Sequence, residues 1–183
     1  MRRRWWPLPS PGSSPSWTCL RADEERNAVD RNAIGRESKA AVNEVEKGAI
    51  RRFAESLGET NPIYFEEAAA RAAGYRSVVA PPTFPTTLRA GSDLREGLLL
   101  SPGKHLLQAE QTFEYARPIV AGDKLTVRSK VVEVSQRNTP SGLTDVVVIE
   151  DEGKDETGTV VYRSRQLWVV RTAPKHAPGD LHE

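Results

Sequence analysis

The fold is decided by residues 53–84, which read FAESLGETNPIYFEEAAARAAGYRSVVAPPTF. A first turn at 58–62 (GETNP) precedes an Ala-rich helix that we expect over 65–73, because Asn-Pro favours turns and Gly74 favours a helix end. A second turn at 78–82 (VVAPP) opens a helix expected over 82–90, since proline is tolerated in a first helical turn. These two turns fix where the two helices begin.

Periodicity predicts the elements on either side of this stretch. We expect a short strand over 41–45 and a helix over 48–57, in which Ile50, Phe53, Ala54 and Leu57 share one face. The C-terminal half alternates as strands do. Helices followed by an antiparallel meander predict an α+β fold, with a curved sheet wrapped around a central helix at 82–90. The expected strands are 105–117, 125–134, 146–150 and 159–171, with loops at 118–123, 138–142 and 152–158.

Composition limits the class of protein. The chain has 183 residues and 38% apolar residues, which suits one globular domain. No apolar run approaches the ~20 residues of a membrane-spanning helix. The only cysteine, Cys19, predicts neither a disulfide framework nor a cysteine metal site, and it fits a reducing cytoplasm. Net charge is +1, so a nucleic-acid footprint is not expected.

The two ends of the chain differ in composition from the domain expected over 29–172. Residues 1–28 begin with a stretch rich in Arg, Trp, Pro and Ser that shows no period, and we interpret them as a disordered extension or a misassigned start. In the second case Val29 would be the initiator. Residues 173–183 are interpreted as a C-terminal tail.

The GETNPIY turn resembles the signature of the MaoC-like (R)-hydratases, which have the hot-dog fold. Those enzymes carry an Asp in a G-D-x-N-P turn and a His two residues after the proline. Glu59 stands at the Asp position and Tyr64 at the His position. Glu59 is one methylene longer than Asp, and a shift of ~1 Å can cost ~100-fold in rate. Tyr64 is a weak base at neutral pH, with a usual pKa near ~10.

The second turn carries a third substitution. The resemblance places an oxyanion-binding backbone N–H, usually that of a glycine, at Pro81, and proline has no N–H. The first available amide is at Thr83. The resemblance therefore implies degenerate catalytic positions at Glu59 and Tyr64, and substrate-binding positions at Asn61, Pro81, Thr83 and Phe84. It implies no cofactor and no metal.

The whole pattern is similar to the FAS1-like dehydratase domains, also called the MaoC-like dehydratase N-terminal family. LGETNPIYF, VVAPPTF and QTFEYARPIVAGDKLTVRSKV carry the resemblance, which covers 29–171. In that family the domain often pairs with a second hot dog that supplies the Asp and His, as in the two-subunit (3R)-hydroxyacyl-ACP dehydratases. The resemblance therefore implies an accessory subunit that binds acyl-CoA or acyl-ACP beside a catalytic partner polypeptide.

Three alternatives remain open from the sequence. The chain can be a self-sufficient hydratase or dehydratase homodimer in which Glu59 is the acid–base group and Tyr64 a hydrogen-bond donor. It can be a non-enzymatic hot dog that binds acyl thioesters. A thioesterase that uses one carboxylate is the weaker remaining reading. Either kind of dimer is expected rather than a monomer, because an isolated sheet exposes its edge.

Overall fold

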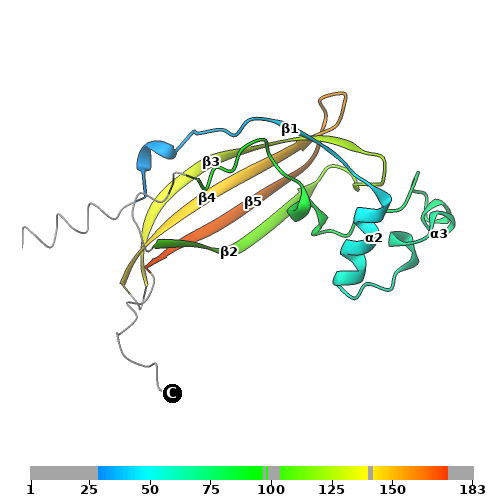
Figure 1. Ribbon diagram of the computed structural model, residues 1–183, viewed down its shortest axis with the longest axis horizontal. Helices are drawn as coiled ribbons and strands as arrows, with labels where there is room; N and C mark the ends of the chain where they lie inside the picture. The colour runs from blue at the N-terminus through cyan, green and yellow to red at the C-terminus, as the bar shows by residue number, and fades with distance from the viewer. Residues whose placement is uncertain (1–28, 97, 99–103, 140–141, 173–183) are drawn as a thin grey trace, which may run out of the picture.

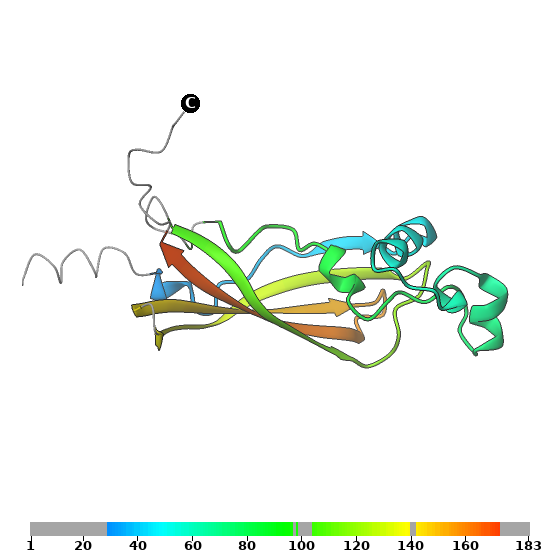
Figure 2. The same cartoon turned by 90° about the horizontal axis from the view of Figure 1, so that it is seen from below.

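The computed structural model describes residues 29–96, 98, 104–139 and 142–172. The expectations for residues 1–28 and 173–183 lie outside this part of the chain. A five-stranded sheet of order β1-β3-β4-β5-β2, antiparallel throughout, curls along its length (Figures 1 and 2). Its strands are β1 (Ala41–Glu44), β2 (Lys104–Tyr115), β3 (Lys124–Thr139), β4 (Gly142–Lys154) and β5 (Val160–Thr172).

The β3–β4 hairpin is longer than predicted. We expected a loop at 138–142 and an acidic loop at 152–158, but β3 continues to Thr139 and β4 extends to Lys154. The acidic residues belong to the sheet because cross-strand ion pairs satisfy them, such as Arg163 with Glu152 at 2.8 Å. Only Asp155–Gly158 forms a turn before β5.

The helices before the sheet match the prediction within two residues at each end. The first, α2 (Lys47–Ser56), buries Ile50 and Ala54, and it is followed after Leu57 by Gly58, whose φ of 71° suits a residue without a side chain. The 3₁₀ turn η2 (Pro62–Tyr64) and the short helix α3 (Glu67–Ala72) follow. A further 3₁₀ turn, η1 (Arg31–Ala33), precedes β1.

The prediction of a central helix over 82–90 is wrong. This segment contains only the 3₁₀ turn η3 (Phe84–Thr87), and Leu88 is already extended. The hydroxyl of Thr86 donates to the Thr83 carbonyl at 2.9 Å, and that of Thr87 to the Phe84 carbonyl at 2.8 Å. Such side-chain bonds, added to three closely spaced prolines, compete with helix propagation. The segment then crosses the concave side of the sheet (Figures 1 and 2).

Most of the buried apolar residues form two clusters on the concave side; Val146 and Val148, which alternate with Val147 along β4, are buried on the opposite face. Cluster 1 lies under α2 and η3, and cluster 2 lies toward the opposite end of the sheet. Cluster 1 comprises Val45, Ile50, Val78, Ala80, Phe84, Ile119, Ala121, Leu125, Val127, Val161 and Tyr162; cluster 2 comprises Val29, Ala33, Leu94, Leu98, Val131, Val147, Ile149, Trp168 and Val170.

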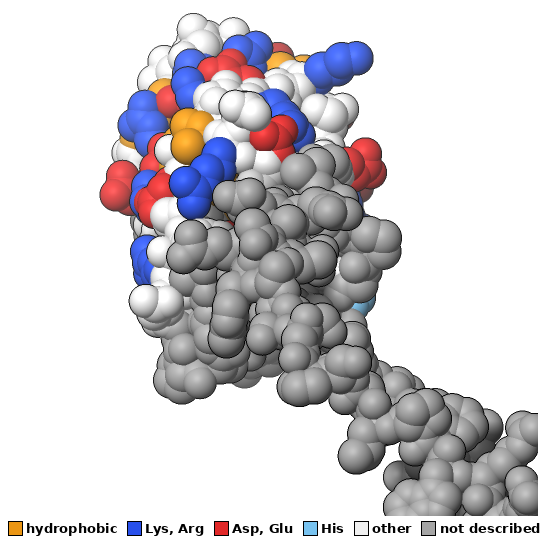
Figure 3. Space-filling view, turned by 90° about the vertical axis from the view of Figure 1, so that its left-hand side faces the viewer, with side chains coloured by type: hydrophobic (Ala, Val, Ile, Leu, Met, Phe, Trp, Pro, Cys, Tyr) orange, Lys and Arg blue, Asp and Glu red, His pale blue; other side chains and the backbone are white. Residues whose placement is uncertain are grey.

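The convex face of the sheet carries ion pairs. Arg165 contacts Glu150 at 2.7 Å, and Arg128 contacts Glu37 at 3.4 Å. Figure 3 shows basic and acidic side chains lying next to one another over the described part of one end of the molecule. Within the described residues, no helix is long and apolar enough to cross a membrane.

Candidate functional site

The candidate site lies where three turns meet beside α2, at one end of the sheet. The Val79 amide donates to the Ile63 carbonyl at 3.0 Å, which joins the VVAPP turn to the GETNP turn. The Ala80 amide donates to the Ile119 carbonyl at 2.8 Å, and Val79 pairs with Val120. These bonds bring together segments that are distant in the sequence.

Glu59 and Tyr64 lie close enough for the negative charge of Glu59 to act on the Tyr64 phenol. Both side chains are half-buried. Burial, followed by the negative charge of Glu59 and by Tyr75, raises the pKa of the Tyr64 phenol above its usual value. The hydroxyl therefore stays protonated at neutral pH, so Tyr64 is a donor rather than a general base. No hydrogen bond joins the two side chains in the described structure.

Asn61 and Phe84 have structural contacts. The Asn61 side-chain oxygen accepts from the Ile63 amide at 3.2 Å and thereby caps η2. Phe84 is 2% exposed and packs edge-on against Phe53, with ring centroids 5.6 Å apart. Two of the expected substrate-binding residues thus help to build the turn and the core.

Pro81 and Thr83 sit at the position of the expected oxyanion donor. Pro81 is buried, and its carbonyl accepts from the Phe84 amide at 2.9 Å. Thr83 is exposed, and its amide bonds to no described residue. One amide in this turn is therefore open to solvent, two residues beyond the position that the resemblance assigns.

Tyr115 was not expected in the site. Its hydroxyl donates to the Pro82 carbonyl and so fixes η3 against the end of β2. The Tyr115 ring lies 6.3 Å from the rings of both Phe113 and Tyr162. Burial raises the pKa of Tyr115 to about 12. In the sequence, only the F-x-Y spacing before Arg117 points to a role for this tyrosine.

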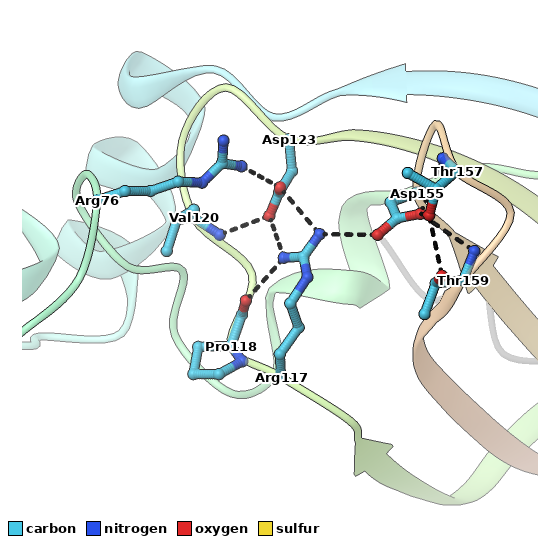
Figure 4. A network of polar contacts seen from close by, with 8 residues as sticks. All are labelled: Arg76, Arg117, Pro118, Val120, Asp123, Asp155, Thr157 and Thr159. Carbon is cyan, nitrogen blue, oxygen red and sulfur yellow. Dashed lines mark hydrogen bonds and ion pairs between the residues drawn. The ribbon is translucent and has the colours of Figure 1, made fainter.

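A polar network, also not expected, secures the turn between β2 and β3 (Figure 4). Asp123 is 4% exposed, and its carboxylate accepts from the Val120 amide at 2.9 Å and from Arg117 at 2.9 and 3.1 Å. Arg76 bonds to the same carboxylate, and Arg117 also reaches Asp155 at 3.6 Å. Asp123 and Asp155 raise the pKa of Arg117. Because the guanidinium groups of Arg76 and Arg117 are already paired with carboxylates of the chain, the network is structural and does not form a site for a free anion.

Catalytic histidine is missing from the site among the described residues. His105, at the start of β2, is the one histidine that the structure describes. Ten residues of strand separate it from Tyr115, a distance of about 33 Å. Nor do the described residues contain a group of three or more His, Cys, Asp or Glu side chains that could hold a metal ion.

Residues 32–164 match the family model of the FAS1-like dehydratase domain region, and the chain belongs to this family. A UPF0336 protein from Streptomyces griseus subsp. griseus is 37% identical over 150 residues, which cover 80% of this chain and 97% of that protein. The expected family is therefore confirmed.

Two solved structures support the fold. The HadBC complex of Mycobacterium tuberculosis, a (3R)-hydroxyacyl-ACP dehydratase, matches with a TM-score of 0.62 and 25% identity over 75% of this chain and 96% of that chain. A MaoC-like dehydratase matches with a TM-score of 0.69 and 27% identity over 80% of this chain and 45% of that chain. The α+β hot-dog fold is confirmed.

Proposed function

We propose that this chain is the accessory, acyl-binding subunit of an (R)-specific enoyl-thioester hydratase or 3-hydroxyacyl-thioester dehydratase. Its substrate is an acyl-CoA or acyl-ACP, and a second hot-dog subunit supplies the catalytic Asp and His. The observation that carries the proposal is the presence of a tyrosine, Tyr64, where the resemblance expects a histidine. At the position of the family's general base stands a phenol whose pKa is raised, while its described surroundings offer no imidazole.

The unpaired edge of β2 supports the presence of a partner. Within the described part of the chain β2 pairs only with β5, so no described strand lies along the other side of this 12-residue strand. Leu107 on this strand is 51% exposed and Tyr115 is 38% exposed. A long, partly apolar edge strand is a template for pairing with another chain. The similarity to HadBC, which is a complex, favours a hot-dog protein as that other chain.

The test is an assay of hydration. The full chain is purified alone and then mixed with a hot-dog protein that carries G-D-x-N-P-x-H, and the loss of enone absorbance of a trans-2-enoyl-CoA is followed. We expect no turnover by the chain alone and turnover by the mixture well above that of the partner alone. A partner whose motif His is replaced by Ala is the negative control.

Glu59→Gln separates the accessory role from the self-sufficient alternative. If the partner does the chemistry, this variant leaves the rate of the mixture within about twofold. Turnover by the chain alone that disappears in Glu59→Gln would instead establish the homodimer that uses Glu59 as its acid–base group. Tight binding of acyl-CoA without turnover in any mixture would favour the non-enzymatic alternative.

A further inference from the structure

Polar side chains separate the two apolar clusters on the concave face of the sheet. Along β5 the residues on this face are Tyr162 of cluster 1, then Ser164 and Gln166, then Trp168 of cluster 2. Across the sheet, Ser164 is paired with Asp151, and Asp151 with Ser129. Gln111 lies opposite Gln166 on β2. We name the polar belt as Gln111, Ser129, Asp151, Ser164 and Gln166.

The side chains of the polar belt satisfy only part of their hydrogen-bonding capacity by bonding to one another and to neighbouring residues. One oxygen of Asp151, Oδ2, accepts from Ser164 Oγ at 2.8 Å and from Gln166 Nε2 at 2.5 Å. Gln111 Oε1 accepts from Gln108 Nε2 at 2.8 Å. Among the described residues, neither the second carboxylate oxygen of Asp151 nor the Nε2 group of Gln111 has a hydrogen-bond partner. One acceptor and one donor therefore remain for a ligand or water.

These open groups line a cavity. Its volume is about 570 Å³, within the size range of small-molecule sites, and it lies between the sheet and residues 85–95, where the predicted central helix is missing. Gln111, Asp151, Gln166 and Trp168 lie on the sheet side. On the other side Arg95 is bonded to Asp93 and lies 5.1 Å from the Trp168 ring; the charge of Asp151 acts on Arg95, but no hydrogen bond between the two is described, so Asp151 Oδ1 keeps its hydrogen-bonding capacity.

A plain hydrocarbon chain fits this cavity poorly. It would remove water from the open oxygen of Asp151 and from the Gln111 amide without replacing their hydrogen bonds. A hydroxyl group would replace both hydrogen bonds, since it donates to a carboxylate and accepts from an amide. Selection of this kind is strong, because a site built to bond a hydroxyl rejects the analogue that lacks it.

We propose that the polar belt recognises an oxygen function, a hydroxyl group above all, on the acyl chain. The inference rests on the proposed function and adds to it: besides the 3-hydroxyl that such a dehydratase removes, the substrate carries an oxygen further along its acyl chain. Asp151 accepts from the hydroxyl, and Gln111 donates to the same or a neighbouring oxygen.

The test is a binding series on the full chain, alone and in complex with its catalytic partner. Isothermal titration calorimetry compares straight-chain CoA thioesters of one length that carry no hydroxyl or one hydroxyl at successive carbons beyond C3, so that the hydroxyl removed by the reaction itself is left out of the comparison. We expect at least one positional isomer to bind about tenfold tighter than the unsubstituted thioester. Asp151→Leu and Gln111→Leu should abolish this preference.

A matched control tests whether the effect is specific to Asp151, and a second variant covers the case in which Asp151→Leu does not fold. Glu150→Leu changes the neighbouring carboxylate on the convex face and should keep the preference. Asp151→Leu removes an acceptor from Ser164 and Gln166. If this variant does not fold, Gln111→Leu decides the question, because the one hydrogen bond described for the Gln111 side chain is to Gln108 at the edge of the sheet.

The outcomes separate the inference from the proposed function. Equal affinities for all isomers, or a preference that Gln111→Leu leaves intact, overturn the polar belt as a recognition site. If the mixture still hydrates a plain enoyl-CoA, the accessory role stands. Absence of binding by every thioester, together with absence of turnover in the mixture, overturns both.

Discussion

The guanidinium of Arg117 holds the buried carboxylate of Asp123 through two hydrogen bonds, Nη1–Oδ2 at 2.9 Å and Nη2–Oδ1 at 3.1 Å. This pair closes the connection from β2 to β3. The Asp123 carbonyl in turn accepts from the Val45 amide at 2.8 Å, which attaches the start of α2 to the same turn. One ion pair therefore positions elements from both halves of the chain.

Asp123→Ala should lower the free energy of unfolding by about 2–4 kcal/mol. The substitution leaves the Val120 amide and Arg117 without their acceptor in a buried turn. Urea denaturation followed by circular dichroism measures the loss. Asp93→Ala is the control, because the Asp93–Arg95 pair is exposed and is worth at most about 1 kcal/mol. Equal losses in the two variants would contradict a structural role for the Asp123 network.

Gly153→Ala should destabilise the sheet by about 1–3 kcal/mol. A methyl group at this position would overlap the ring of Tyr162 on the neighbouring strand. In a Tyr162→Ala background the same substitution should cost much less, and a double-mutant cycle measures the difference. Gly158→Ala serves as a control for backbone strain alone, because its φ is 83° but no atom lies within 4 Å. Additive losses at 153 and 162 would argue against the overlap.

Stability should fall as the pH rises above about 10. The pKa of Tyr115 is raised by burial to about 12 in the folded state, and that of an unfolded tyrosine is about 10. Between these values the unfolded chain loses the proton while the folded chain keeps it, so unfolding is favoured with increasing pH. Burial also raises the pKa of Tyr162, which acts in the same direction.

Tyr115→Phe isolates this contribution. The variant should lose about 1 kcal/mol near pH 9, because the bond to the Pro82 carbonyl is gone, yet its stability should depend less on pH between 10 and 12. Unfolding free energies measured at several pH values test both parts. An unchanged slope would mean that Tyr115 does not titrate with unfolding.

Leu107→Lys should weaken association with the proposed catalytic partner at least about tenfold. Leu107 is 51% exposed on the open edge strand β2, and a lysine there opposes pairing of sheet edges. Analytical ultracentrifugation of the mixture measures the effect. Val42→Lys is the matched control, since Val42 is 70% exposed on β1 at the opposite edge. Weakening by Val42→Lys alone would place the interface at β1.

Local signals explain what could be predicted. Helical spacing with Gly58 and Gly74 at the ends located α2 and α3, and alternation located most of β2, β3 and β5. The helix expected over 82–90 failed because the hydroxyls of Thr86 and Thr87 and the prolines compete with helical bonding. The length of β4 was missed because charged residues obscure a strand whose charges are paired across the sheet.

The sequence by itself determined the hot-dog class and the family, and it predicts that Glu59, Tyr64 and Pro81 occupy the positions of the family's catalytic groups. These features depend on residue identity and short spacing, which a chain displays directly. Tertiary structure alone decided three features: the ion pair between Arg117 and Asp123, the open edge of β2 and the polar belt. Each of these depends on strand register and burial, which bring together side chains far apart in sequence and remove some of them from water.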